Sequence, residues 1–212
     1  MKPFFIVFLV AAAPLAAAEP EKSAVKISFV TFGVSTEGVS EATCGWGSGT
    51  VIQSGGGKSL VLTNRHVCPH ASGHPFVVVG TKTYSAEWIA ADPGPDLALI
   101  RVPVELPAVD LADSDPEEGT TLRQWGYSGR GPIKPKSGSA LGTVNFRTED
   151  GAKVEALITG IDVEPADSGS GVFNPDGRLV AVAFAAGGPV DGPRHEHCVP
   201  LAAIKRFLGQ HR

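Results

Sequence analysis

The sequence predicts an all-β protein, and three features of the chain support that class. Short runs rich in β-branched and aromatic residues recur along its length. Turns built from glycine, proline, asparagine and aspartate separate these runs. Only the C-terminal tail has the apolar spacing of a helix. Many short strands at such intervals are typical of a β-barrel or a β-sandwich, and the pattern alone leaves both architectures open.

The expected elements follow one another in order, each bounded by turn residues. The glycine-rich turn 54–57 separates the early strands, and an Asp-Pro-Gly-Pro turn at 92–95 precedes a strongly apolar run. Later strands are separated by Asn-Pro-Asp-Gly at 174–177 and Gly-Gly-Pro at 187–189. A helix is expected at 201–208, where apolar residues recur at helical spacing. The strands are expected at 25–34, 49–53, 59–63, 76–79, 86–91, 97–102, 121–127, 142–148, 154–161, 179–184 and 195–199.

Length and charge limit the possible organisation and partners. A chain of 212 residues is long enough to form one large domain or two small lobes. The proline-rich and acidic segment 103–116 is the expected connector between lobes. The formal net charge is −4, and no basic run is present that would follow a phosphate backbone. We therefore expect no nucleic-acid partner.

The N-terminus has the features of an export signal. Lys2 precedes an apolar run at 4–10, and three alanines at 16–18 fit the small-residue rule at a signal-peptidase site. We expect residues 1–18 to be a signal peptide and the mature protein, 19–212, to be secreted or periplasmic. The alternative is an uncleaved anchor, but roughly 15 apolar residues interrupted by Pro14 fall short of the ~20 that span a bilayer. No later segment is apolar enough to span a membrane.

Three cysteines in an exported chain allow at most one internal disulfide. Cys44 and Cys68 lie on either side of the segment that leads to His66, so a bridge between them would fix that segment. Cys198 would then keep a free thiol. The other pairings remain open, because connectivity cannot be read from a sequence.

Three short segments carry the residue types of serine-nucleophile chemistry. They place His66 in Thr-Asn-Arg-His-Val, Asp96 in Asp-Leu-Ala-Leu-Ile and Ser168 in Asp-Ser-Gly-Ser-Gly. A serine hydroxyl is a poor nucleophile at neutral pH, so it needs an imidazole to take its proton and a carboxylate to orient that imidazole. Glycines at 169 and 171 give the loop that carries Ser168, called the serine loop below, the freedom to aim backbone N–H groups at an oxyanion.

These segments, in this order, resemble the chymotrypsin-fold serine proteases, especially bacterial trypsin-like peptidases of the Deg (high-temperature-requirement) and glutamyl-endopeptidase types. The resemblance implies two six-stranded antiparallel β-barrels with the active site between them and a C-terminal helix. The N-terminal barrel would cover about 25–105, the C-terminal barrel about 117–200, and the closing helix 201–208. The segments that carry the resemblance are GSGTVI at 47–52, LVLTNRHV at 60–67, DLALI at 96–100, PADSGSGVFN at 165–174, GRLVAV at 177–182 and CVPL at 198–201.

The resemblance also implies roles for individual residues. Ser168 would be the nucleophile, His66 the general base, and Asp96 the group that orients it, while the N–H groups of Ala166 and Ser168 would form the oxyanion hole. The family usually has glycine where this chain has Ala166, and a Cβ there resists positive φ. Asp167 pairs with a new N-terminal amine in zymogen-activated relatives. No such start follows a basic residue here, so we expect activity without propeptide removal, with Asp167 satisfied by loop amides or an arginine.

Specificity is open between two interpretations. Asp162 lies six residues before Ser168, at the register where trypsin-like relatives carry the acid of the specificity pocket, which would favour Arg or Lys substrates. If Asp162 points elsewhere, the small residues Ala183, Ala185 and Ala186 would suit an aliphatic side chain. His195 and His197 are further candidates for the pocket lining.

The expected function is a serine endopeptidase that acts on polypeptide substrates as a monomer, without cofactor or metal. Its main rival is a weak or inactive protease-like binding module, which Ala166 makes plausible. A second rival is a metal site, because zinc accepts histidine and cysteine ligands, although neither spacing matches a known zinc motif. The candidate ligands are His66, Cys68, His70 and His74, or His195, His197 and Cys198.

Overall fold

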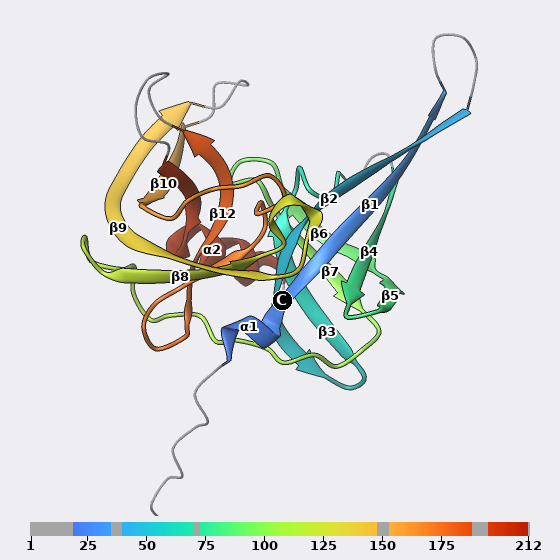
Figure 1. Cartoon of the computed structure of the whole chain (residues 1–212), viewed down its shortest axis with the longest axis horizontal. Helices are drawn as coiled ribbons and strands as arrows, with labels where there is room; N and C mark the ends of the chain where they lie inside the picture. The colour runs from blue at the N-terminus through green and yellow to red at the C-terminus, as the bar shows by residue number, and fades with distance from the viewer. Residues whose placement is uncertain (1–18, 35–39, 70–72, 148–152, 188–194, 212) are drawn as a thin grey trace, which may run out of the picture.

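The computed structural model describes residues 19–34, 40–69, 73–147, 153–187 and 195–211. Its strands form a seven-stranded sheet of order β5-β4-β1-β2-β3-β7-β6 and a closed six-stranded barrel of order β10-β13-β12-β11-β8-β9. In Figure 1 the barrel lies on the left and the N-terminal sheet on the right. The prediction of an all-β fold with a C-terminal helix is confirmed.

The N-terminal half begins with a short helix that the sequence did not predict, α1, at Pro20–Ser23. The strands after it agree with the predicted runs in position, apart from β5, which was not predicted. The strands are β1 Ala24–Val34, β2 Ser40–Gly55, β3 Lys58–Asn64, β4 Gly73–Val79, β5 Lys82–Ser85, β6 Glu87–Asp92 and β7 Leu97–Val102.

In the C-terminal half, the chain forms the barrel and then the closing helix. A 3-10 turn, η1, at Ser128–Arg130 follows the first barrel strand, and the short strand β11 directly after the serine loop was not predicted. The elements are β8 Thr121–Gly126, β9 Lys134–Arg147, β10 Lys153–Thr159, β11 Gly171–Phe173, β12 Leu179–Gly187, β13 His195–Pro200 and the helix α2 Leu201–His211.

Strands β1 and β2 form a long hairpin whose outer part extends beyond the rest of the sheet (Figure 1). The pairing runs from Ala24 opposite Thr50 to Val34 opposite Ser40. The predicted strand 49–53 is therefore only the last part of β2. Residues 40–48 are rich in serine and glycine and have weak strand propensity of their own, so pairing with the β-branched strand β1 determines their conformation.

The N-terminal sheet differs in detail from the expected six-stranded barrel. It has seven strands, and its edge strands β5 and β6 are not paired with each other. Ala86 alone separates β5 from β6 along the chain, so the two edges of the sheet lie close together. The N–H of Ala86 continues the β4–β5 pairing by donating a 2.9 Å hydrogen bond to the carbonyl of Pro75.

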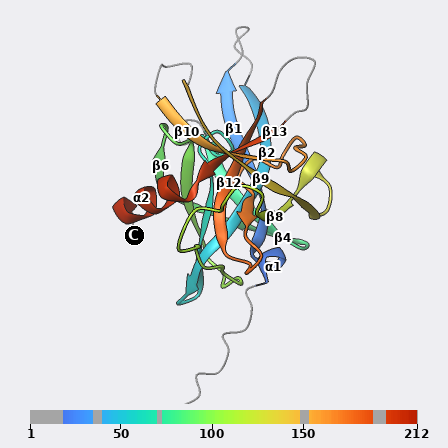
Figure 2. The ribbon, with the colours of Figure 1, turned by 90° about the vertical axis from the view of Figure 1, so that its left-hand side faces the viewer.

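Helix α2 seals the junction between sheet and barrel. Its buried residues Ile204, Phe207 and Leu208 belong to one apolar cluster together with Leu97 and Leu99 of β7 and with residues of β11, β12 and β13. Figure 2 shows α2 lying across the side of the molecule. Burying each such side chain contributes about 1.5–3 kcal/mol, so the helix fixes the position of one sheet relative to the other.

The cysteines do not form the expected disulfide. All three are free thiols: Cys44 is exposed on the β1–β2 hairpin, while Cys68 and Cys198 are buried. The prediction of a bridge is wrong because Cys44 points to solvent on the hairpin whereas Cys68 belongs to the core of the N-terminal sheet. Burial raises the pKa of the Cys68 thiol to about 12, which makes it unreactive at neutral pH.

The predicted signal peptide lies outside the described residues. Among the helices that the structure describes, none is long and apolar enough to cross a membrane.

Candidate active site

His66 and Asp96 meet at the end of a paired set of strands. Asn64, the last residue of β3, lies opposite Leu97, the first residue of β7, so the residues just beyond these ends are brought together. The two oxygens of the Asp96 carboxylate accept separate hydrogen bonds from His66, one from its backbone N–H at 3.0 Å and one from Nδ1 at 2.5 Å. In the neutral imidazole, a proton on Nδ1 leaves Nε2 unprotonated and able to act as a base.

The backbone of Asp96 is held in an unusual conformation. Its φ is 57°, a left-handed value that aspartate tolerates better than most residues. The Asp96 carbonyl accepts hydrogen bonds from the N–H of Arg65 at 3.0 Å and from Nδ2 of Asn64 at 3.1 Å. The side chain of Asp96 is 25% exposed and that of His66 is 48% exposed, so the acid is sheltered behind an accessible imidazole.

Ser168 lies in the loop between β10 and β11 and is half-buried. Its carbonyl accepts a 2.8 Å hydrogen bond from the N–H of Ser48 on β2. A Cβ on the neighbouring Gly47 would lie 2.5 Å from the Val67 side chain and 3.1 Å from the Ser168 carbonyl. Strand β2 therefore passes between the His66 segment and the serine loop, and glycine at 47 lets the two approach each other.

No hydrogen bond joins the Ser168 hydroxyl to the His66 ring in the described part of the chain. Such contacts are often long in free enzymes and tighten when substrate binds. The structure thus brings His66 and Asp96 into direct contact, while the bond from His66 to Ser168 stays a prediction.

Glycine is required at 169 for conformation and for space. The φ of Gly169 is 88°, and a Cβ there would overlap the carbonyl of Ser48 and the hydroxyl of Thr63. Thr63 in turn donates a 2.7 Å hydrogen bond to that same Ser48 carbonyl. The serine loop is thus packed directly against the N-terminal sheet.

Ala166 adopts the positive φ that the sequence made doubtful. Its φ is 75°. Within the described residues, the backbone N–H groups of Ala166 and Ser168 donate to no other protein group, so both are available to an oxyanion.

Asp167 is 1% exposed and its carboxylate is fully engaged. One oxygen accepts a 2.6 Å hydrogen bond from the Ser128 hydroxyl, and the other accepts from Lys136 Nζ at 2.5 Å and from the N–H of Glu164 at 2.9 Å. The loop amide, one of the two expected alternatives, is therefore present, and a lysine from β9 supplies a positive charge beside it. Lys136 also lowers the pKa of the exposed Glu164 carboxyl by its charge.

A second buried acid lies in the barrel. Glu196 on β13 is 1% exposed, and its carboxyl accepts hydrogen bonds from Gln124 Nε2 at 2.7 Å and from the Thr159 hydroxyl at 3.3 Å. The same Gln124 nitrogen donates to the Ser170 hydroxyl at 2.7 Å, and this hydroxyl donates to the Asp167 carbonyl at 2.6 Å. Burial raises the pKa of Glu196 to about 7, with an additional increase from the charge of Asp167.

The predicted specificity residues lie around the serine loop. Asp162 is exposed, and its carbonyl accepts a 2.9 Å hydrogen bond from Lys136 Nζ. Ala183 on β12 is buried and exchanges hydrogen bonds with the loop, accepting from Gly169 at 2.8 Å and donating to Ser170 at 2.9 Å. Ala185 pairs with His197 beyond a register shift. Their roles in substrate selection stay predictions.

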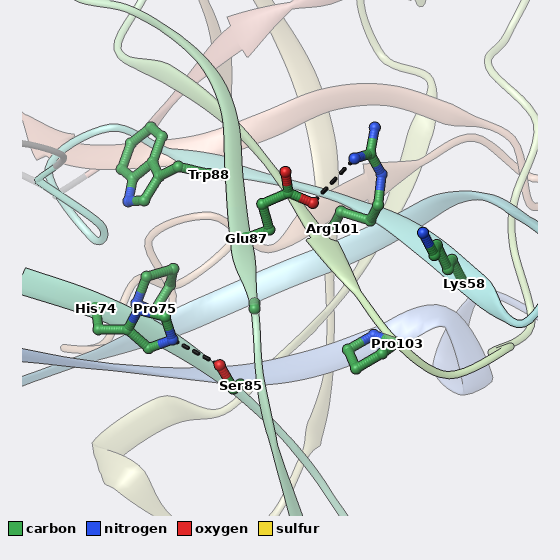
Figure 3. A pocket seen from close by; sticks show the side chains of 9 residues that line it. Lys58, His74, Pro75, Ser85, Glu87, Trp88, Arg101 and Pro103 are labelled. Carbon is green, nitrogen blue, oxygen red and sulfur yellow. Dashed lines mark hydrogen bonds and ion pairs between the residues drawn. The ribbon is translucent and has the colours of Figure 1, made fainter.

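A pocket of about 490 Å³ lies elsewhere, on the N-terminal sheet, and contains none of the predicted catalytic residues (Figure 3). There His74 Nε2 is 2.6 Å from the Ser85 hydroxyl, and Arg101 pairs with Glu87 at 2.9 Å. No described carboxylate is bonded to the His74 ring, so this histidine–serine pair lacks the orienting acid that His66 has.

The contacts of Ser48, Lys136, Gln124 and Glu196 were missed by sequence reasoning. Ser48 lies within the segment 47–52, whose resemblance to the protease family assigns no role to Ser48 itself. Lys136 and Gln124 lie on the paired strands β9 and β8, where a barrel interior position gives no local signal. Glu196 is buried between two half-buried histidines on β13, and strand alternation places it on the opposite face from them without indicating which face is buried.

Known proteins resemble this chain in sequence and in fold. A family described as trypsin-like peptidase domain matches residues 47–182. A probable periplasmic serine endoprotease, DegP-like, of Marinomonas sp. (strain MWYL1) is 30% identical over 144 residues, which cover 64% of this chain and 29% of the relative. Exfoliative toxin A of Staphylococcus aureus is 30% identical over 158 residues, covering 59% of this chain and 52% of the toxin. The matched regions thus span about half or less of these relatives' lengths.

Among solved structures, the active form of the Rv3671c protease from M. tuberculosis has a TM-score of 0.74 and 22% identity, covering 100% of this chain and 93% of that one. An HtrA-type protease solved with a decapeptide has a TM-score of 0.76 and 16% identity, covering 91% of this chain and 63% of that one. At these identities, the two likenesses establish the shared fold.

Proposed function

We propose that this chain, which belongs to the trypsin-like peptidase domain family, is a serine endopeptidase that acts through Ser168, His66 and Asp96. The observation that carries the proposal is the two-point hydrogen bonding of the Asp96 carboxylate to His66, at 3.0 Å and 2.5 Å. This arrangement fixes both the tautomer and the direction of the imidazole, which is the task of the acid in a serine triad. The serine loop lies across β2 from this pair.

In the proposed mechanism, the Ser168 hydroxyl oxygen attacks the carbonyl carbon of a peptide bond while His66 Nε2 takes its proton. The negative charge on the former carbonyl oxygen is received by the N–H groups of Ala166 and Ser168. The imidazolium, stabilised by Asp96, then protonates the leaving amine and leaves an acyl-serine ester. A water molecule, deprotonated by His66, hydrolyses that ester and returns the enzyme to its starting state.

The availability of both oxyanion donors supports catalysis. In the described residues, neither Ala166 nor Ser168 uses its N–H within the protein. Asp167 between them is anchored by Lys136, Ser128 and Glu164, so the loop holds its conformation without an ion pair to a new N-terminus. The proposal therefore includes activity without propeptide cleavage.

The proposed setting and organisation follow the same reasoning. Residues 1–18 would be removed as a signal peptide, and 19–212 would act as a monomeric peptidase on polypeptides in the periplasm or outside the cell. The N-terminal lobe would comprise about 25–105 and the C-terminal lobe about 117–200. The periplasmic description of the DegP-like relatives supports this location.

A weak or inactive binding module is the second candidate. It is favoured by two observations: Ala166 in place of the family's usual glycine, and the missing hydrogen bond between Ser168 and His66 in the described residues. Peptide binding without turnover would then be the activity of the same surface.

A fluorophosphonate probe separates the two candidates, because it reacts only with an activated serine. We expect the folded protein to be labelled, the Ser168→Ala variant to be unlabelled, and Ser85→Ala to be labelled as the wild type is. Ser85 is a matched control because it also lies beside a histidine, at 2.6 Å. Absence of labelling in folded wild-type protein, or equal labelling of Ser168→Ala, would favour the binding module. Cleavage of a peptide library would then establish the preferred residue at the scissile bond.

A further inference from the structure

Ser48 on β2 is fully buried and contacts the serine loop with three of its atoms. Its N–H donates to the Ser168 carbonyl at 2.8 Å, and its hydroxyl donates to the Ala166 carbonyl at 2.9 Å. Its own carbonyl is in the contact that requires glycine at 169. Ser48 thus reaches across from the N-terminal sheet and holds the loop on both sides of Asp167.

The direction of the Ser48 hydroxyl proton is determined by a further contact. The N–H of Tyr127 donates to the Ser48 oxygen at 3.0 Å. Because a lone pair of that oxygen is used by Tyr127, the hydroxyl proton is left to point at the Ala166 carbonyl. The bond from Ser48 to Ala166 is therefore a directed one within a buried chain of hydrogen bonds.

Two bonds fix the peptide groups on either side of the Ala166 Cα. The Pro165 carbonyl, on the N-terminal side, accepts from the N–H of Gly129 at 2.8 Å. The Ala166 carbonyl, on the C-terminal side, accepts from Ser48. With both peptide planes held, the φ of 75° at Ala166 is imposed from outside, and so is the direction of the Ala166 N–H.

Without such support, alanine would leave this conformation. The left-handed region is disfavoured for a residue with a Cβ by roughly tenfold in population, whereas glycine enters it freely. One hydrogen bond of ordinary strength changes a population by a similar factor. The Ser48 bond is therefore of the size needed to decide which conformation the loop adopts.

We infer that Ser48 is a positioning residue that holds Ala166 in the left-handed conformation and so aims the Ala166 N–H at the oxyanion. This inference rests on the proposed function, since it concerns one half of the proposed oxyanion hole. It explains how a chain with alanine at position 166 can keep a working loop. Glycine adopts a positive φ through its own backbone freedom, whereas alanine is held at a positive φ by the hydrogen bond from Ser48.

The test compares Ser48→Ala with a matched control in the same sheet. Ser59 is also buried, donates to the Val104 carbonyl at 2.8 Å and accepts from the N–H of Leu106 at 2.9 Å. Ser59→Ala thus loses the same kinds of bond at a distance from the serine loop. We expect Ser48→Ala to lower kcat about tenfold with KM within about twofold, because oxyanion contacts strengthen in the transition state. Ser59→Ala should leave both constants near wild type.

A second substitution gives the specific readout. In the Ser48→Ala background, Ala166→Gly should recover about fivefold or more of kcat, because glycine adopts the positive φ without the hydroxyl. Ala166→Gly in the wild-type background is measured alongside, and the recovery is the ratio of the kcat changes that this substitution causes in the two backgrounds. A general loss of stability on removing Ser48 would not be repaired by a glycine in the loop. If Ser48→Ala does not fold, Ser48→Cys keeps a side chain of similar shape with a weak donor and enters the same comparison.

The outcomes distinguish the inference from the proposed function. Wild-type protein with no labelling and no turnover that depends on Ser168 would overturn the proposed function, and the inference with it. Active wild-type protein, with Ser48→Ala or Ser48→Cys as active as Ser59→Ala, would overturn the inference alone. The inference would also be overturned if Ala166→Gly failed to restore the activity that a Ser48 variant had lost. A kcat loss restored by glycine supports the inference.

Discussion

The substitution Glu196→Gln should remove a pH dependence of stability that originates in the barrel interior. The carboxyl of Glu196 is buried, and the groups around it are Gln124 on β8, Thr159 on β10, Cys198 on β13 and the carboxylate of Asp167 in the serine loop. Burial raises its pKa from 4.5 to about 7. Between these values the folded protein keeps a proton on Glu196 that the unfolded chain has lost.

The sign follows from proton binding in the two states. Because the folded state binds more protons than the unfolded state between pH 4.5 and about 7, stability falls as pH rises through this range and levels off above it. The shift from 4.5 to about 7 corresponds to about 3 kcal/mol at about 1.4 kcal/mol per unit. A glutamine at 196 carries no charge at any of these values and keeps an oxygen to accept from Gln124.

Urea unfolding of both proteins at half-unit steps from about pH 4.5 to about pH 8 measures this difference. Relative to wild type, Glu196→Gln should gain stability progressively with pH, by about 3 kcal/mol in total, and the gain should stop near pH 7. Other titrating groups are common to both proteins and cancel in the difference. Glu155→Gln on the exposed face of β10 is the control. A difference between Glu196→Gln and wild type that stays constant across the range would refute the reasoning.

Three other predictions concern the serine loop and the triad. Ser168→Ala and His66→Ala should each lower kcat by about 10⁴-fold or more, and the double variant should be hardly worse, because the groups act as a unit; additive losses in steady-state assays would contradict the assignment. Lys136→Met should destabilise the protein by about 3–5 kcal/mol in urea unfolding, because it leaves a buried carboxylate unpaired. Lys134→Met, which breaks only an exposed pair, should cost about 1 kcal/mol or less, and equal losses for the two lysines would show that burial is not the cause. Gly169→Ala should remove activity and lower stability by about 2 kcal/mol or more, because its Cβ overlaps the Ser48 carbonyl, and a fully labelled, stable variant would show that the loop can move.

Strand positions were predictable where a run carries its own signal. Strand β7, Leu97–Val102, was predicted with its observed limits because it is continuously apolar and follows an Asp-Pro-Gly-Pro turn. Strand β9 begins at Lys134, eight residues before its predicted start, because the segment Lys-Pro-Lys-Ser-Gly has little strand propensity and is held by pairing with β8. Such strands are specified by their partners.

The candidate site divides in the same way. His66, Asp96 and Ser168 stand in short segments whose composition points to their chemistry. The groups that hold them in place lie far away in the sequence: Ser48 is 118 residues from the alanine whose carbonyl it binds, and Lys136 is 31 residues from Asp167. Nothing local marks a serine in a strand or a lysine on a barrel as the partner of a loop. The positive charge beside Asp167 comes from Lys136 on β9, a residue that no pattern around the serine loop indicates.

The residues of the proposed triad come from both halves of the fold, and strand β2 contacts both sets. His66 and Asp96 depend on the pairing of β3 with β7, whereas Ser168 follows the barrel strand β10. Gly47 of β2 lies between the Val67 side chain, next to His66, and the Ser168 carbonyl. Its neighbour Ser48 is hydrogen-bonded to the serine loop. In the proposed mechanism, the position of β2 therefore bears both on the separation of His66 and Ser168 and on the direction of the Ala166 N–H, because this one strand contacts the segments that carry all three residues.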